Sequence, residues 1–164
     1  MHPLLLLVLL SLVASSCKPS PLKELGKVPD FSLEDVNGTA VQWESFRGRP
    51  VLVFFGYTYC PDFCPITLRK VEEAYRESGK PDDWPQLIFI SVDPERDSPS
   101  SLQKYMEKFD IPGTALTGSE KELREAAKQF GVTFYTDPAN SELIQHSPTL
   151  FIIDESGHIR YLFK

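Results

Sequence analysis

A pattern typical of a buried strand occurs twice in this chain, and a helix pattern separates the two copies. The run Val51–Phe55 is wholly apolar, and Leu87–Val92 is interrupted only by Ser91. Continuous apolar runs of this length are typical of strands that are covered on both faces of a sheet. Between them, Ile66–Glu77 repeats apolar residues at helical spacing, and Pro65 suits the first turn of that helix. This order predicts two parallel strands joined by a right-handed crossover.

Two further strand pairs are predicted on either side of this unit. Asn37-Gly38 is a signal for a type I′ hairpin and stands between two short strand candidates. Towards the other end, strands are predicted over Thr149–Ile153 and His158–Phe163, with a turn at Glu155-Ser156-Gly157 between them. These two strands are expected to pair antiparallel, and Thr136–Ser147 before them is expected to be a loop. The sequence thus predicts a sheet with both parallel and antiparallel strands.

Two more helices are predicted between the second apolar run and that loop. Ser98-Pro99 is a suitable helix start, and an apolar stripe follows it. Ser119 and Glu122 form a capping box for the next helix, and Gly131 is well placed to end it. We therefore predict an α/β sandwich. A thioredoxin-like fold fits this order best, with a central mixed sheet, a parallel βαβ core, an N-terminal hairpin and a C-terminal antiparallel hairpin.

The first residues carry a targeting signal. Leu4–Ala14 is almost wholly apolar and is too short for a membrane span, which needs about 20 residues, but it suits the core of a signal peptide. Ala14-Ser15-Ser16 leads into Cys17, an arrangement that resembles a bacterial lipoprotein signal. We expect a signal peptide over residues 1–16, lipidation of Cys17, a flexible tether over 17–30 and one domain over 31–164. An ordinary secretory signal with a spare Cys17 is the alternative.

Both alternatives place the protein outside the cytoplasm. The lipoprotein signal predicts a lipid anchor on the extracytoplasmic face of the bacterial cytoplasmic membrane.

The chain has 17 Lys and Arg against 23 Asp and Glu, and the net charge of −6 argues against nucleic acid as a partner. It has three cysteines, so the signal leaves one pair. One pair is too few for a disulfide scaffold, and we expect it to have a function. A monomer is expected, because no surplus apolar stripe is visible.

That pair, Cys60 and Cys64, follows the first apolar run within the sequence Cys60-Pro61-Asp62-Phe63-Cys64-Pro65. Two thiols four residues apart can share one metal ion or close one disulfide. Cys64 is expected at or near the N-terminus of the following helix, where the helix dipole stabilises a thiolate. A purely structural disulfide is the alternative, but a bond that closes so small a loop constrains the unfolded chain little.

Strand directions predict that a histidine and an aspartate lie at the same edge of the sheet as the cysteines. Open α/β sheets carry their chemistry beyond the carboxyl ends of the parallel strands. Cys60 follows one such end and Asp93 follows the other, while His146 directly precedes the returning antiparallel strand. We therefore expect Cys60, Cys64, Asp93 and His146 to converge. The alternatives are a loop histidine with a satisfied hydrogen bond and an ordinary strand-end carboxylate.

Two thiolates and one imidazole make a soft site with few ligands. Thiolates favour Cu(I), and imidazole accepts both Cu(I) and Cu(II), so copper is the expected cofactor. A structural zinc site would normally have a fourth protein ligand. Asp93 is expected to act in binding or partner contact rather than as a ligand. We expect Phe63 to be exposed and the other aromatic residues near the site to form core and site wall: Phe54, Phe55, Tyr57 and Tyr59.

Three motifs stand in the order found in one known family. They are FGYTYCPDFCP at residues 55–65, SVDPERD at residues 91–97, and His146-Ser147 before an apolar strand and a glycine turn. In these motifs the chain resembles the Sco/SenC family of copper-binding assembly factors for cytochrome c oxidase, over roughly residues 31–164. The resemblance implies a thioredoxin-like fold in which Cys60, Cys64 and His146 bind copper, with Asp93 at the position of an acidic family residue near the site.

The family delivers copper to the dinuclear site of oxidase subunit II, and some members reduce the cysteines of that site. The chain departs from the family pattern in three places. Gln145 stands where many relatives have an acidic residue. Pro148 stands where relatives often lack a proline and where thioredoxin-type oxidoreductases place a cis-proline, which keeps thiol redox chemistry open. The sequence ends at Lys164 directly after a strand, where a helix is usual, so either the chain is shortened or one sheet face is less fully covered.

The site residues allow three functions. A metallochaperone would bind copper through Cys60, Cys64 and His146 and pass it to oxidase subunit II by ligand exchange, with no turnover chemistry of its own. An extracytoplasmic thiol–disulfide oxidoreductase would attack through Cys60 and resolve through Cys64, although the common exchange motif is C-x-x-C. A thioredoxin-like reductant or another copper carrier is a further expected partner. A peroxidase of the peroxiredoxin kind would need an arginine beside an activated thiol, and the site motif offers no obvious one.

Overall fold

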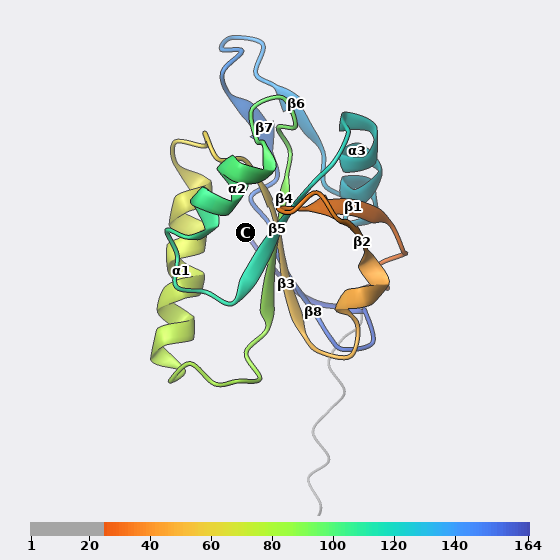
Figure 1. Cartoon of the computed structure of the whole chain (residues 1–164), viewed down its shortest axis with the longest axis vertical. Helices are drawn as coiled ribbons and strands as arrows, with labels where there is room; N and C mark the ends of the chain where they lie inside the picture. Colours follow the sequence, from red (N-terminus) through yellow and green to blue (C-terminus); the bar gives the residue numbers. More distant parts are fainter. Residues whose placement is uncertain (1–24) are drawn as a thin grey trace, which may run out of the picture.

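Seven strands form one sheet with helices on both of its faces in the computed structural model, which describes residues 25–164 (Figure 1). The strand order is β2-β1-β5-β4-β3-β8-β9. These strands are β1 (Ser32–Asp35), β2 (Ala40–Gln42), β3 (Val51–Gly56), β4 (Gln86–Ser91), β5 (Gly113–Thr117), β8 (Leu150–Ile153) and β9 (Ile159–Phe163). The expected signal peptide, Cys17 and the first part of the expected tether lie outside the described residues.

The two apolar runs form the predicted parallel pair. β3 and β4 run parallel, and the helix between them is α1 (Phe63–Glu77). β8 returns antiparallel along β3, and β9 pairs antiparallel with β8, as predicted. A third parallel strand, β5, lies beyond β4 and follows α2 (Pro99–Met106). The sequence patterns did not predict β5, because a glycine and two threonines leave its five residues without an apolar run.

The sheet separates two apolar layers. Val51, Val53 and Phe55 of β3 pack in the layer that contains α3 (Glu120–Gln129), whereas Leu52 and Phe54 pack in the layer that contains α1 and α2. Figure 1 shows α1 and α2 on one side of the sheet and α3 on the other. Because successive side chains of a strand point to opposite faces, a strand covered on both faces needs an apolar residue at every position. The predicted α/β sandwich with a parallel core is therefore confirmed.

The N-terminal hairpin pairs β1 with β2, but the prediction of a type I′ turn was wrong. That turn needs positive φ at both central residues, whereas Gly38 has φ 75° and Lys80 is the one non-glycine residue with positive φ in residues 25–164. The carboxylate of Asp35 instead accepts the backbone N–H groups of Asn37 and Thr39 at 2.8 and 2.9 Å. Aspartate commonly bonds the backbone two residues further on, and here it fixes the turn.

The predicted start of α2 and the predicted start and end of α3 are confirmed. The Ser98 hydroxyl accepts the backbone N–H of Ser101, and α2 begins at the proline that follows Ser98. Ser119 and Glu122 form both bonds of the predicted capping box at the start of α3. Gly131 follows the end of α3 with φ 66°, the left-handed conformation expected just past a helix. A short 3-10 helix, η1 (Trp43–Phe46), follows β2 and was not predicted.

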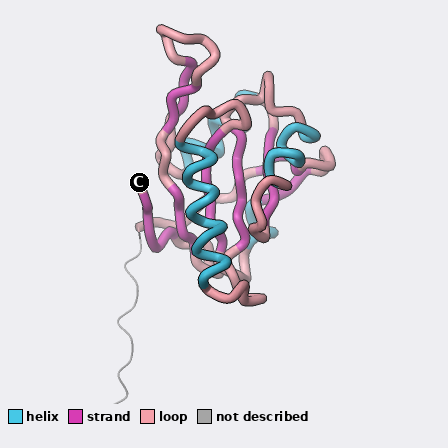
Figure 2. Tube along the Cα trace, turned by 90° about the vertical axis from the view of Figure 1, so that its left-hand side faces the viewer, coloured by secondary structure: helices cyan, strands magenta, loops and turns pink. Residues whose placement is uncertain are grey.

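The predicted loop over Thr136–Ser147 contains most of a second hairpin. β6 (Phe134–Thr136) and β7 (Ile144–His146) pair antiparallel with each other and with no strand of the main sheet. The hairpin projects beyond the end of the main sheet in both views (Figure 1, Figure 2). Strands of three residues give too little alternation to be predicted, so expecting a loop here was wrong. Since no main-sheet hydrogen bonds reach this hairpin, other contacts must hold it in place.

The end of the expected tether belongs to the fold. The backbone N–H of Leu25 donates to the carbonyl of Ile159 at 2.9 Å, and that of Val28 donates to Gly157 at 3.0 Å. Val28 is fully buried, so residues 25–28 lie against the turn between β8 and β9 and the start of β9. All peptide bonds of the described residues are trans, which includes the bond before Pro148. In the same range, no helix is both long and apolar enough to cross a bilayer.

Candidate metal centre

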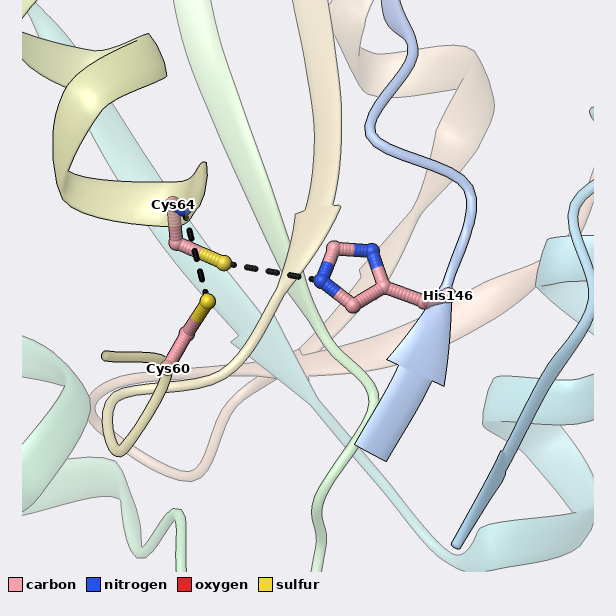
Figure 3. Close-up of side chains that lie close together, drawn as sticks. All are labelled: Cys60, Cys64 and His146. Carbon is pink, nitrogen blue, oxygen red and sulfur yellow. Dashed lines mark hydrogen bonds between the residues drawn. The ribbon is translucent and has the colours of Figure 1, made fainter. Parts of the chain in front are cut away.

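Three of the four predicted site residues bring possible ligand atoms together at one edge of the sheet (Figure 3). The sulfur atoms of Cys60 and Cys64 and a ring nitrogen of His146 all lie within 4.8 Å of one another. Cys60 lies in the loop between β3 and α1, Cys64 lies in the first turn of α1, and His146 is the last residue of β7. The convergence that strand directions predict is therefore confirmed for these three. Asp93 is not part of this group.

Cys64 is fully buried at the start of α1. The helix begins at Phe63, three residues before the predicted start, so Cys64 is its second residue. Gly56, the last residue of β3, makes room for the thiol, because a Cβ at this position would lie 2.8 Å from Cys64 Sγ and 3.0 Å from the ring of Phe89. The thiol can therefore lie over the end of β3 only because this position lacks a side chain.

Cys60 is half-buried, and its sulfur takes the place of a helix cap. The sulfur accepts the backbone N–H of Cys64 at 3.4 Å, whereas the residue that precedes the helix, Asp62, makes no side-chain cap (Figure 3). The hydrogen bond from the Cys64 side chain is the largest cause that lowers the pKa of Cys60 to about 4. Burial opposes this shift, while His146 and the backbone N–H groups of Asp62 and Cys64 add to it. Cys60 is therefore a thiolate at neutral pH.

Cys64 shifts in the opposite direction and keeps its proton. Its hydrogen bond to Cys60 is the largest cause that raises the pKa of Cys64, and burial and the charge of Cys60 raise it further. The two thiols are free, with no disulfide between them. The pair thus consists of a partly accessible thiolate, which can act as nucleophile or ligand, and a buried thiol, which becomes a ligand when it loses its proton.

His146 is oriented as a ligand by its own backbone and by two rings. Its Nδ1 lies 3.1 Å from the carbonyl oxygen of Ser147, and its Nε2 lies 3.6 Å from Cys64 Sγ. Because a carbonyl oxygen can only accept, Nδ1 donates to it, and Nε2 is the ring nitrogen that faces the thiols. The rings of Phe54 and Tyr57 pack edge-on against the imidazole, with centroids at 6.3 and 6.0 Å. A hydrogen bond on the far ring nitrogen is the usual support of a metal-binding histidine.

Asp93 is buried and is engaged by a neighbouring arginine. Its carboxylate accepts Nε of Arg96 at 2.5 Å, and its backbone N–H donates to the hydroxyl of Ser91. Gln145 donates to the carboxylate of Asp137 at 2.6 Å on the exposed hairpin. The side chains of Asp93 and Gln145 are therefore both hydrogen-bonded to neighbouring side chains, Arg96 and Asp137.

Asp97 holds the loop that leads to Cys60, a role that was not predicted from the sequence. It is only 1% exposed, and its carboxylate accepts the Thr58 hydroxyl at 2.6 Å, the Thr58 backbone N–H at 3.2 Å and the Ser91 hydroxyl at 2.8 Å. Burial raises the pKa of Asp97, against the effect of these hydrogen bonds. Asp97 lies six residues past the end of β4, so the position just past a parallel strand, which indicated Asp93, does not indicate Asp97.

The burial of the aromatic residues near the site agrees with the prediction except at Tyr59. Phe54, Phe55 and Tyr57 are buried, as expected. Tyr59 is 61% exposed, so placing it in the core or site wall was wrong. It lies inside the turn in which the Cys60 N–H bonds the carbonyl of Tyr57, and this turn takes the chain out of the strand layers. Phe63 is also 61% exposed, as predicted.

A family model, a related sequence and a solved structure that match this chain all point to the same family. Residues 20–164 match the family model described as SCO1/SenC. The mitochondrial SCO2 homolog of Mus musculus is 34% identical over 133 residues, which cover 78% of this chain and 52% of the relative, so the chain spans about half the length of that protein. The structure of Bradyrhizobium japonicum ScoI with copper bound is 35% identical, with a TM-score of 0.76, and the match covers 85% of this chain and 90% of that one.

A second copper-bound structure has the same fold. Yeast Sco1 with copper bound is 28% identical, with a TM-score of 0.73, and the match covers 84% of this chain and 79% of that one. The likeness extends over most of the described chain and confirms the predicted thioredoxin-like fold.

Proposed function

The chain belongs to the SCO1/SenC family, and we propose that it is a copper metallochaperone with Cys60, Cys64 and His146 as ligands. The observation that carries the proposal is the closeness of two sulfur atoms and one imidazole nitrogen, all within 4.8 Å of one another. This donor set suits Cu(I), and the imidazole also suits Cu(II). Two similar proteins, ScoI of Bradyrhizobium japonicum and yeast Sco1, have been solved with copper bound, which supports copper as the cargo.

We further propose that the recipient is the dinuclear copper site of cytochrome c oxidase subunit II, during assembly of the oxidase. Cys60 and His146 are both partly accessible, while Cys64 is fully buried. A recipient ligand can therefore reach the metal on the side of Cys60 and His146, and exchange would begin there. A lipid anchor at Cys17 would hold the protein at the extracytoplasmic face of the bacterial cytoplasmic membrane. There, another copper carrier would supply its copper, or a thioredoxin-like reductant would keep its cysteines reduced.

The test is an anaerobic titration of the reduced protein with Cu(I) against a competing chelator. We expect binding of one ion per chain, and we expect His146→Ala to weaken it by at least about tenfold, because a direct ligand is lost. His158→Ala is the matched control, since His158 lies in the turn between β8 and β9 and contacts Ser156 there. Binding that is indifferent to His146, or equally sensitive to both histidines, would contradict the ligand set.

A second function is favoured by the state of the two thiols. A thiolate at Cys60 beside a protonated Cys64 is the arrangement that thiol–disulfide exchange needs. In our alternative proposal, Cys60 attacks one sulfur of a disulfide in the target, which releases the other sulfur as a thiol. Cys64 then gives up its proton and displaces the first sulfur, which leaves a Cys60–Cys64 disulfide and a reduced target. This predicts reductase activity that is lost in Cys60→Ser and kept in His146→Ala.

A further inference from the structure

We propose that Arg96 is a positioning residue that holds the β6–β7 hairpin against the cysteine loop and so makes His146 available as the third ligand. The proposal rests on the function proposed above, because it assumes that His146 binds the metal. It concerns a residue of the loop between β4 and α2, outside the ligand group.

One guanidinium group links three segments of the chain. Nε of Arg96 donates to the carboxylate of Asp93 in the same loop. Its Nη1 donates to the carbonyl oxygen of Glu142 at 2.9 Å, in the chain that leads into β7. Its central carbon lies 5.7 and 5.2 Å from the ring centroids of Tyr57 and Tyr59, which precede Cys60. Arg96 therefore contacts both the loop that carries Cys60 and the hairpin that carries His146.

The hairpin depends on such contacts because its own pairing is short. Two strands of three residues are marginally stable alone. Two other side chains bond its backbone: the Tyr57 hydroxyl accepts the N–H of Ile144 at 3.2 Å, and Nη1 of Arg124 donates to the carbonyl of Phe134 at 3.1 Å. The third bond is that of Arg96, whose acceptor, Glu142, lies four residues before His146. Of the three side chains, Arg96 is the one that is paired with a buried charge, the carboxylate of Asp93.

Asp93 makes this bond effective. Its side chain is 6% exposed, and that of Arg96 is 30% exposed, so water competes weakly for the pair. A buried carboxylate needs a charged partner. Nε of Arg96 is that partner for Asp93, while Nη1 of the same guanidinium donates to the carbonyl oxygen of Glu142. Asp93 thus acts on the site through Arg96. Lysine could not replace the arginine, because one ammonium cannot bond two acceptors in the fixed geometry of a guanidinium.

The test measures Cu(I) affinity in a double-mutant cycle on the reduced protein, with wild type, Arg96→Gln, His146→Ala and the double variant. We expect Arg96→Gln to weaken binding by about 10–100-fold in the wild-type background, as is usual for residues that orient a ligand. In the His146→Ala background the same substitution is expected to change affinity by less than about twofold, because the ligand it positions is gone. An equal loss in both backgrounds, or no loss in wild type, would overturn the proposal.

Arg69→Gln is the matched control. Arg69 also pairs with a carboxylate, that of Glu72, and lies over an aromatic ring, that of Phe109 at 4.8 Å, but it contacts no part of the hairpin in these interactions. We expect its Cu(I) affinity to equal that of wild type. Arg96→Lys is the second variant at the site, and it keeps the charge if Arg96→Gln does not fold. We expect Arg96→Lys to bind Cu(I) as weakly as Arg96→Gln. Wild-type affinity in Arg96→Lys would contradict the claim that one guanidinium must bond both Asp93 and Glu142.

Amide hydrogen exchange of the copper-free protein gives a readout that does not depend on the metal. We expect residues 134–146 to exchange faster in Arg96→Gln than in wild type, while β3 and β4 keep their protection. Unchanged exchange in the hairpin would overturn the proposal even if copper affinity falls. If His146→Ala alone leaves copper affinity unchanged, the ligand set of the proposed function fails, and hydrogen exchange alone then decides whether Arg96 holds the hairpin.

Discussion

Replacing Asp97 by alanine is expected to destabilise the fold through the loop that carries Cys60. The carboxylate of Asp97 is the acceptor for the backbone N–H and the hydroxyl of Thr58 and for the hydroxyl of Ser91. Asp97 is almost completely buried, so water cannot replace the lost acceptor without entering the fold. Asp97→Ala therefore leaves three donors without a partner, and two of them belong to a residue two positions before Cys60.

The expected loss follows from these three bonds. Each lost hydrogen bond costs about 1 kcal/mol, so the free energy of unfolding of Asp97→Ala should fall by about 3 kcal/mol. Asp97→Asn keeps one carbonyl oxygen for Thr58 and deprives only the Ser91 hydroxyl of its acceptor, so its loss should be about 1 kcal/mol. Burial of the carboxylate raises its pKa above the ordinary 3.8, and this sets the pH dependence.

The sign of that pH dependence follows from the direction of the shift. When the pKa is higher in the folded state, protonation stabilises the fold, and this contribution is present below 3.8 and is lost as pH rises through the folded value. Asparagine has no such contribution. Asp97→Asn should therefore cost more stability relative to wild type in acid than at neutral pH.

Urea unfolding of the reduced, copper-free protein measures these differences. Asp83→Ala is the control, because Asp83 is exposed in the loop between α1 and β4 and should change stability by less than about 0.5 kcal/mol. If Asp97→Ala lost no more stability than Asp83→Ala, the three hydrogen bonds would not support the loop. If Asp97→Asn cost as much as Asp97→Ala, the bonds to Thr58 would not be the source of the loss.

Two further predictions concern the cysteines. Gly56→Ala should cost about 1–3 kcal/mol by overpacking and weaken Cu(I) binding, because its Cβ would lie 2.8 Å from Cys64 Sγ. The control is Gly118→Ala, whose Cβ would meet its nearest side-chain atoms at the longer distance of 3.2 Å, none of them in a cysteine, so it should cost less stability and leave copper binding unchanged. Thermal unfolding with and without Cu(I) measures both variants, and equal effects of the two would contradict the packing argument. Because the pKa of Cys60 is about 4, its alkylation rate by iodoacetamide in the reduced copper-free protein should stay nearly constant between about pH 6 and pH 8. An ordinary thiol would gain roughly 75-fold over that range, and mass spectrometry of the labelled cysteine distinguishes the two outcomes.

Two kinds of sequence signal carry the successful predictions. The apolar runs of β3 and β4 and the caps at Ser98 and Ser119 are local patterns, and local patterns predict local elements. The placement of His146 beside Cys60 needed only the directions of the strands, although 86 residues separate the two in the sequence. A parallel core with one returning strand leaves a single edge where these segments can meet.

The parts that escaped prediction depend on contacts between distant segments. β6 and β7 are too short to show a period, and Tyr57, Arg96 and Arg124 bond their backbone from other elements. Nothing near Arg96 in the sequence indicates that its side chain reaches the carbonyl of Glu142. Such a bond between a side chain and a remote backbone becomes visible only once the chain is folded.

The two proposed functions depend on different parts of the molecule. Cys60 and Cys64 belong to the main fold, since one lies in the loop held by Asp97 and the other in the buried first turn of α1. His146 belongs to a hairpin that is joined to this fold by side-chain bonds. Disulfide exchange needs only the first part, whereas a three-ligand copper site needs both. Oxidation of the two cysteines removes both thiolate ligands, so the same pair cannot hold copper and a disulfide together. Under these proposals, the position of the hairpin and the redox state of the thiols would decide together which of the two functions the site performs.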